Sequence, residues 1–150
     1  MKKSRINDVA ERAVAYFSSG YNCSQSVLLA MTEHWNIKSD IIPKIATSFG
    51  SGISRSDSLC GALTGGIMAI GVKYGTNKPS SDERKKAYDI AYGFSKDFEQ
   101  RCGGVRCTDL LGYNLSKPNE KDKAINVNAS GKKCPDYLRH TVCALLQLEK

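Results

Sequence analysis

A glycine-rich apolar stretch, residues 56–71, constrains the fold more than any other part of the sequence. It reads Ser-Asp-Ser-Leu-Cys-Gly-Ala-Leu-Thr-Gly-Gly-Ile-Met-Ala-Ile-Gly. Its Ser and Asp residues are typical helix-capping side chains, and the residues after Cys60 are apolar or small on every side, as in a helix buried all round. Each glycine inside a helix costs about 1 kcal/mol relative to alanine, so Gly61, Gly65, Gly66 and Gly71 need a compensating gain. Because Gly61 and Gly65 share one face, we expect another backbone or a ligand to approach the helix there.

The remaining apolar residues recur mainly at helical spacing. The spacing of Ile6, Val9, Ala13, Tyr16 and Phe17 predicts a first helix of about 14 residues. Further helices are expected at residues 23–35, 41–49, 81–102 and 134–148, with one or two turns at 107–111. Residues 50–55 are expected to form a flexible turn, and residues 116–133 a polar surface loop. The sequence thus predicts an all-α, single-domain protein (residues 1–150), a bundle of five to six helices around a central glycine-rich buried helix.

The charge and hydropathy patterns argue against nucleic-acid and membrane binding. The formal charge is +7, but the basic residues are scattered and form no face interleaved with aromatic residues. The longest nearly apolar run, residues 63–72, is shorter than the roughly 20 residues that cross a bilayer. The basic start, Met-Lys-Lys-Ser-Arg-Ile-Asn-Asp, lacks the apolar segment of a secretory signal. We therefore expect a cytoplasmic protein that binds neither nucleic acid nor a membrane.

The chain has six cysteines, and four of them fall at or next to a predicted helix start. These four are Cys23, Cys60, Cys107 and Cys134. Free backbone N–H groups and the helix dipole stabilise a thiolate there, which lowers the thiol pKa and makes the sulfur a nucleophile or a metal ligand. The alternative is that each is an ordinary buried thiol, since cysteine is among the most buried residue types. Cys102 lies in line with Phe94 and Phe98, which favours a buried, inert thiol.

Metal binding by the same four cysteines is the second interpretation. Four thiolates can hold a zinc ion or an iron–sulfur cluster. Their spacings contain no Cys-x-x-Cys pair, which is the usual local clamp, and no Cys-x-x-Cys-His haem attachment site. His34 lies too far from Cys23 along the predicted helix to pair with it, and His140 has no visible partner. No dinucleotide-binding fingerprint or P-loop is present.

The ordered set of motifs resembles the C_GCAxxG_C_C family, whose members are proposed to be redox-active proteins and selenoproteins. The matching segments are Gly-Tyr-Asn-Cys-Ser-Gln-Ser-Val at 20–27, Cys-Gly-Ala-Leu-Thr-Gly-Gly at 60–66, Cys-Thr-Asp-Leu-Leu at 107–111, and Cys134 before the last helix. The resemblance implies a cysteine-dependent redox role with an uncharacterised substrate. Selenocysteine in some members would favour catalytic thiol chemistry over structural zinc. Cys102 and Cys143 lie outside the pattern.

The sequence thus predicts a redox protein, a candidate thiol oxidoreductase, that uses Cys23, Cys60, Cys107 and Cys134 in thiol–disulfide exchange. A low-pKa thiolate would attack an oxidised substrate, and a second cysteine would resolve the intermediate. The alternatives are a metal- or cluster-binding module and a structural helical domain with buried thiols. We expect Cys60 to be the most reactive thiol, with Asp57 acting as a helix cap. The substrate or redox partner, the electron donor, any cofactor, the oligomeric state and the cysteine pairing stay open.

Overall fold

The computed structural model describes residues 2–150, and these form helices without a β-strand. In chain order the elements are α1 (Lys2–Ser18), α2 (Cys23–His34), the 3-10 helix η1 (Lys44–Phe49), α3 (Gly50–Arg55), α4 (Gly61–Tyr74), α5 (Ser81–Cys102), α6 (Cys107–Leu111), α7 (Pro118–Asn126) and α8 (Ala129–Gln147). The expected all-α class is confirmed. The expected count of five to six helices is wrong, because the described residues contain eight α-helical segments, three of which are short.

Side-chain caps fix where the two best-defined helices begin. The Asn22 side chain accepts a hydrogen bond from the Gln25 N–H, and the Gln25 side chain accepts one from the Asn22 N–H, which completes a capping box at the start of α2. Ser80 caps α5 by accepting a hydrogen bond from the Glu83 N–H, and Gly103 ends the helix in a left-handed conformation. Both helices therefore begin at a side chain that accepts a hydrogen bond from their first turn.

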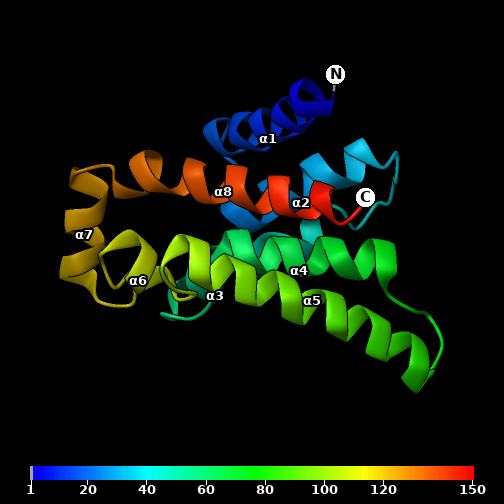
Figure 1. Ribbon diagram of the computed structural model, residues 1–150. Coiled ribbons are helices and arrows are strands. Elements are labelled where there is room, and N and C mark those ends of the chain that lie inside the picture. Colours follow the sequence, from blue (N-terminus) through cyan, green and yellow to red (C-terminus); the bar gives the residue numbers. More distant parts are fainter. Residues whose placement is uncertain (1) are drawn as a thin grey trace.

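Helix α4 packs against α2, α5 and α8, and Figure 1 shows it running between α8 and α5. Its glycines allow these contacts. A Cβ on Gly65 would lie 2.7 Å from the Ser24 carbonyl oxygen of α2, and one on Gly66 would lie 2.5 Å from the Phe94 ring of α5. We expected this helix to be buried on every side. That expectation is wrong for its last turn, where Gly71, Val72 and Lys73 are exposed. The close approach needs glycine only over the first two turns, at Gly61, Gly65 and Gly66.

The second half of the chain is more helical than its polarity suggested. The segment expected as a loop, residues 116–133, contains α7 and the start of α8. Ala124 and Ala129 are buried against Leu111 and give this polar segment a narrow apolar face. Consequently α8 begins five residues before Cys134, which lies in its second turn and not at its start. The helix expected at residues 41–49 is shorter than predicted, and only Lys44–Phe49 are helical, as the 3-10 helix η1.

Segment α3 is a left-handed turn and not the flexible connection expected there. Residues 51–55 all have positive φ, between 55° and 67°, although Gly52 is the one glycine among them. L-residues pay about 1–2 kcal/mol each for this conformation, so tertiary contacts must hold it. The Ser54 hydroxyl donates a hydrogen bond to the Ser48 carbonyl over 2.9 Å, and the Ser58 N–H donates to the Gly52 carbonyl over 3.0 Å.

None of the helices in residues 2–150 combines the length and the apolar character needed to cross a membrane.

Substituting two glycines of α4 tests the close packing. We expect Gly65→Ala to lower the free energy of unfolding by about 1–3 kcal/mol, since its Cβ would meet the Ser24 backbone. Gly71→Ala is the matched control: nothing lies within 4 Å of the added Cβ, so better helix propensity should raise the free energy by up to about 1 kcal/mol. Denaturant unfolding of both variants measures the difference. Equal effects would contradict the packing described.

Candidate active site

Four cysteines from four helices or their caps line one small cavity. The cavity has a volume of about 20 Å3 and is lined by Cys23, Ser51, Cys60, Gly61, Cys107, Leu110, Leu111, Cys134 and Tyr137. The structure thus brings all four of the predicted site cysteines together beside Gly61. Gly61 makes this possible, because a Cβ on it would lie only 2.9 Å from the Cβ of Cys23. All six cysteines of the chain are free thiols.

A short backbone pairing brings Cys60 and Cys107 together. The Cys60 N–H donates to the Val105 carbonyl over 2.7 Å, and the Cys107 N–H donates to the Ser58 carbonyl over 2.9 Å, on either side of the Leu59–Arg106 bridge. Cys60 is the N-cap residue of α4 and Cys107 is the first residue of α6.

Asp57 connects these two segments and is not a helix cap. Its carboxylate accepts hydrogen bonds from the side chains of Arg106, Thr108 and Asn114, all outside its own segment. The expected capping role is therefore wrong. Since α4 begins at Gly61, Asp57 lies too far before the helix to cap it, and instead it holds the start of α6 against the segment that leads into α4.

Cys23 and Cys134 form a hydrogen-bonded thiol pair. The hydrogen bond from the Cys134 thiol is the main cause that lowers the pKa of Cys23; burial opposes it, and the backbone N–H groups of Cys23 and Ser51 add to the lowering. The same hydrogen bond raises the pKa of Cys134, and burial raises it further. Cys23 is thus the group that ionises first, and Cys134 keeps its proton.

The environment of Cys60 does not favour the high reactivity expected for this thiol. Burial raises the pKa of Cys60 to about 12 and the Cys23 charge adds to this rise, although the N–H groups of Ala62 and Leu63 oppose it. The helix start is therefore present, but desolvation outweighs it because Cys60 is 6% exposed. Burial and the charges of Cys23 and Asp57 likewise raise the pKa of Cys107 to about 11.

The other two cysteines lie outside the cavity. Burial and the nearby Asp97 carboxylate raise the pKa of Cys102 to about 11, and burial raises the pKa of Cys143. The interpretation of Cys102 as an inert core thiol agrees with this environment. His140, which had no visible partner in the sequence, pairs with Asp97 over 3.0 Å.

The metal interpretation finds no preformed ligand cluster. Within residues 2–150, no group of three or more His, Cys, Asp or Glu side chains has an arrangement that could hold a metal ion. The four cavity cysteines are therefore close enough to share electrostatic effects but are not placed as a ligand set.

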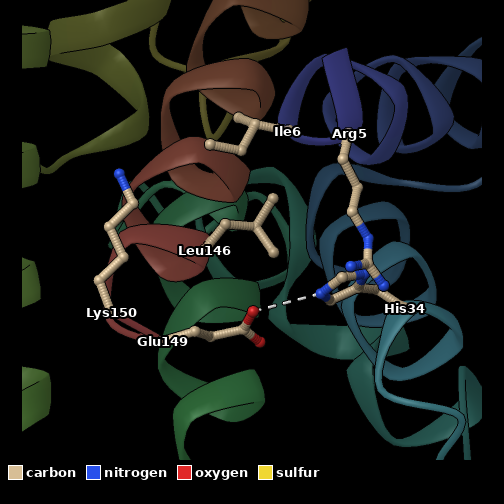
Figure 2. A pocket seen from close by; sticks show the side chains of 6 residues that line it. All are labelled: Arg5, Ile6, His34, Leu146, Glu149 and Lys150. Atoms are coloured by element: carbon tan, nitrogen blue, oxygen red, sulfur yellow. Dashed lines mark hydrogen bonds and ion pairs between the residues drawn. The ribbon is translucent and has the colours of Figure 1, made fainter. Parts of the chain in front are cut away.

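A larger cavity, which no sequence motif indicates, lies away from the cysteines. It has a volume of about 490 Å3 and is lined by Arg5, Ile6, His34, Leu146, Glu149 and Lys150 (Figure 2). Its residues come from α1, α2, the last turn of α8 and the residues that follow α8, so no local motif marks it. Glu149 binds His34 over 3.3 Å and Lys73 over 2.9 Å. Burial alone would raise the pKa of Glu149, but hydrogen bonds from Lys73, Trp35 and His34 outweigh burial and lower it to about 2.

The Glu149 cluster should make stability depend on acid pH. A carboxylate with a lowered folded-state pKa stabilises the protein above its unfolded pKa of 4.5, and this contribution is lost as the pH falls towards about 2. We expect Glu149→Gln to be less stable than the native chain at pH 7, with the difference shrinking below pH 4.5. Denaturant unfolding across this range measures it. The control is Glu99→Gln, whose exposed ion pair with Lys96 should contribute little at any pH; a pH-independent Glu149 effect would contradict the cluster.

The thiol ranking predicts which cysteine reacts first. With limiting iodoacetamide at about pH 6.5, where an ordinary thiol is about one per cent ionised, Cys23 should be alkylated before the other five. Its lowered pKa gives it the larger thiolate fraction. Peptide mapping by mass spectrometry of the reduced, metal-free protein gives the order. Earlier labelling of Cys60 or Cys102 would show that the hydrogen bond from Cys134 does not activate Cys23.

Comparison with known proteins assigns most of the chain to one family. The model of the family described as "Putative redox-active protein (C_GCAxxG_C_C)" matches residues 21–148. The chain is 30% identical over 109 residues to an uncharacterised protein of Archaeoglobus fulgidus, an alignment that covers 66% of this chain and 71% of that protein. No solved structure matches the chain. With four of its cysteines around one cavity and a family match over most of its length, the chain belongs to the C_GCAxxG_C_C family.

Proposed function

We propose that this protein performs thiol–disulfide redox chemistry with Cys23 as the nucleophile and Cys134 as the resolving cysteine. The hydrogen bond between these two thiols carries the proposal, because it gives one member of the pair a lowered pKa and the other a raised pKa. Such a difference assigns distinct roles to two otherwise equal groups. The family description as redox-active proteins supports the same class of chemistry.

The exchange follows from these two protonation states. The Cys23 thiolate attacks one sulfur of an oxidised disulfide substrate, forms a mixed disulfide and releases the other substrate sulfur as a thiolate. Cys134 transfers its proton to that leaving thiolate and then attacks the Cys23 sulfur. The second substrate thiolate departs, and the protein is left with a Cys23–Cys134 disulfide. A thiol reductant returns the two electrons by the reverse exchange.

Cys60 and Cys107 provide a second pair of thiols at the same cavity. Both have raised pKa values and therefore stay protonated while Cys23 is ionised. In this proposal they accept the disulfide from Cys23–Cys134 by internal exchange, so that all four cysteines take part. The cytoplasm is the compartment proposed for this activity, since a reducing environment keeps the resting thiols free.

A metal- or cluster-binding module is the alternative function, favoured by the presence of four thiols around one cavity. The two functions make different predictions for protein purified without chelator. Exchange chemistry requires free thiols that titrate quantitatively and no bound metal. Bound zinc or iron at one equivalent, together with fewer accessible thiols, would replace the exchange proposal with the metal function.

Removing the Cys134 hydrogen-bond donor tests the proposed pair. We expect Cys134→Ala to move the pH midpoint of Cys23 alkylation upward and to slow the reaction at about pH 6.5 by roughly tenfold, the value of one hydrogen bond to a charged group. Cys134→Ser keeps an O–H donor and should have a smaller effect. Cys143→Ala is the control, because Cys143 lies outside the cavity. An unchanged Cys23 profile in Cys134→Ala would overturn the assignment of the two roles.

A further inference from the structure

The size of the cysteine cavity limits what can react inside it. Its volume of about 20 Å3 is little more than the 10–15 Å3 that one water molecule needs. Its walls are also close-packed on two sides. A Cβ on Gly61 would lie 2.9 Å from the Cβ of Cys23, and one on Gly52 would lie 2.8 Å from the Cβ of Cys107. The backbone at Gly61 and Gly52 therefore lies directly against Cys23 and Cys107 and keeps this part of the cavity narrow.

The cavity also selects by charge and hydrogen bonding. Among the described residues that line it, none is Asp, Glu, Lys, Arg or His, so an anion or cation would lose its hydration without gaining a counter-charge. The Tyr137 hydroxyl is already engaged, since it donates a hydrogen bond to the Leu110 carbonyl over 2.8 Å. The protonated thiols of the cavity are the remaining proton donors, and that of Cys134 is hydrogen-bonded to Cys23. A fitting reactant is small, neutral and able to take up a proton.

We propose that the oxidant that this site accepts is hydrogen peroxide, the smallest hydroperoxide. This inference rests on the proposed function, because it uses Cys23 as the nucleophile and Cys134 as the resolving cysteine. It adds an oxidant to that function: a molecule slightly larger than water fits the cavity beside the Cys23 sulfur, whereas a bulky hydroperoxide does not fit inside it.

The reaction balances with the two thiols alone. The Cys23 thiolate attacks one peroxide oxygen, so that an S–O bond forms and the O–O bond breaks. The leaving hydroxide takes the proton of Cys134 and becomes water, which leaves Cys23 as a sulfenic acid and Cys134 as a thiolate. Cys134 then attacks the Cys23 sulfur and displaces hydroxide, which takes a proton from solvent. Cys23 and Cys134 lose two electrons in total, and peroxide is reduced to two water molecules.

Size discrimination tests this inference on the native chain. Reduced protein is mixed with hydrogen peroxide or with cumene hydroperoxide, and loss of free Cys23 is followed by rapid quenching and mass spectrometry. Free cysteine under the same conditions gives the intrinsic ratio of the two rates. We expect the ratio of the hydrogen peroxide rate to the cumene hydroperoxide rate to be at least about tenfold higher for Cys23 than for free cysteine. Protein unfolded in urea is the control and should lose this preference.

Product analysis identifies the roles of the two sulfurs. Native protein should form a Cys23–Cys134 disulfide, and Cys134→Ser should instead accumulate a Cys23 sulfenic acid that dimedone traps. Leu111→Ala, which removes part of the cavity wall, should raise the rate with cumene hydroperoxide more than the rate with hydrogen peroxide.

The outcomes separate this inference from the function on which it rests. A ratio within about twofold of free cysteine would overturn the peroxide assignment. If glutathione disulfide then still forms a mixed disulfide with Cys23, exchange chemistry would stand. Cys23 that is oxidised by neither peroxide nor disulfide would overturn both proposals.

Discussion

The close approach of α2 and α4 is the contact on which the site depends. Gly61 and Gly65 present bare backbone to α2, so that Cys23 and Ser24 lie directly against α4. A side chain at either glycine would separate the helices. Cys23 would then move away from Cys60 and from the Ser51 N–H that stabilises its thiolate. The cost of placing glycine in a helix is offset by this contact.

Sharing one cavity makes the four thiols electrostatically dependent on each other. The charge on Cys23 raises the pKa of Cys60, Cys107 and Cys134, so ionisation of the first thiol suppresses ionisation of the others. In a small volume with little water, such repulsion is weakly screened. Once Cys23 is ionised, the other three thiols therefore keep their protons. The hydrogen bond from Cys134 decides that Cys23 carries the charge.

Much of the fold and the membership of the site could be predicted from the sequence. Helical spacing, the caps Asn22 and Ser80, and the glycines of α4 are local signals, and local signals determine where long helices form. The four cysteines were also found, because helix-start positions and family motifs mark them. The exposure of the last turn of α4 could not be predicted, because Val72 is apolar and continues the pattern of the buried residues before it.

The order of the thiol pKa values and the conformations of the short segments could not be predicted, because both depend on tertiary contacts. A helix start lowers a thiol pKa only if burial does not outweigh it, and the burial of Cys60 cannot be read from its neighbours in sequence. Cys134 lies within α8, so its partner Cys23 and not a helix end defines its role. Asp57 resembled a cap, but its partners Arg106, Thr108 and Asn114 lie about fifty residues away in the chain.

The left-handed turn at residues 51–55 has a consequence for the timescale of the site. Ser51 lines the cavity, and its N–H stabilises the Cys23 thiolate, yet its backbone and that of Ile53, Ser54 and Arg55 are in a conformation that L-residues disfavour. Releasing the turn recovers that conformational energy while the surrounding helices stay folded. Local opening here is consequently less costly than global unfolding. For the proposed redox chemistry, this means that a reductant would reach oxidised Cys23 by the opening of these five residues, without unfolding of the whole protein.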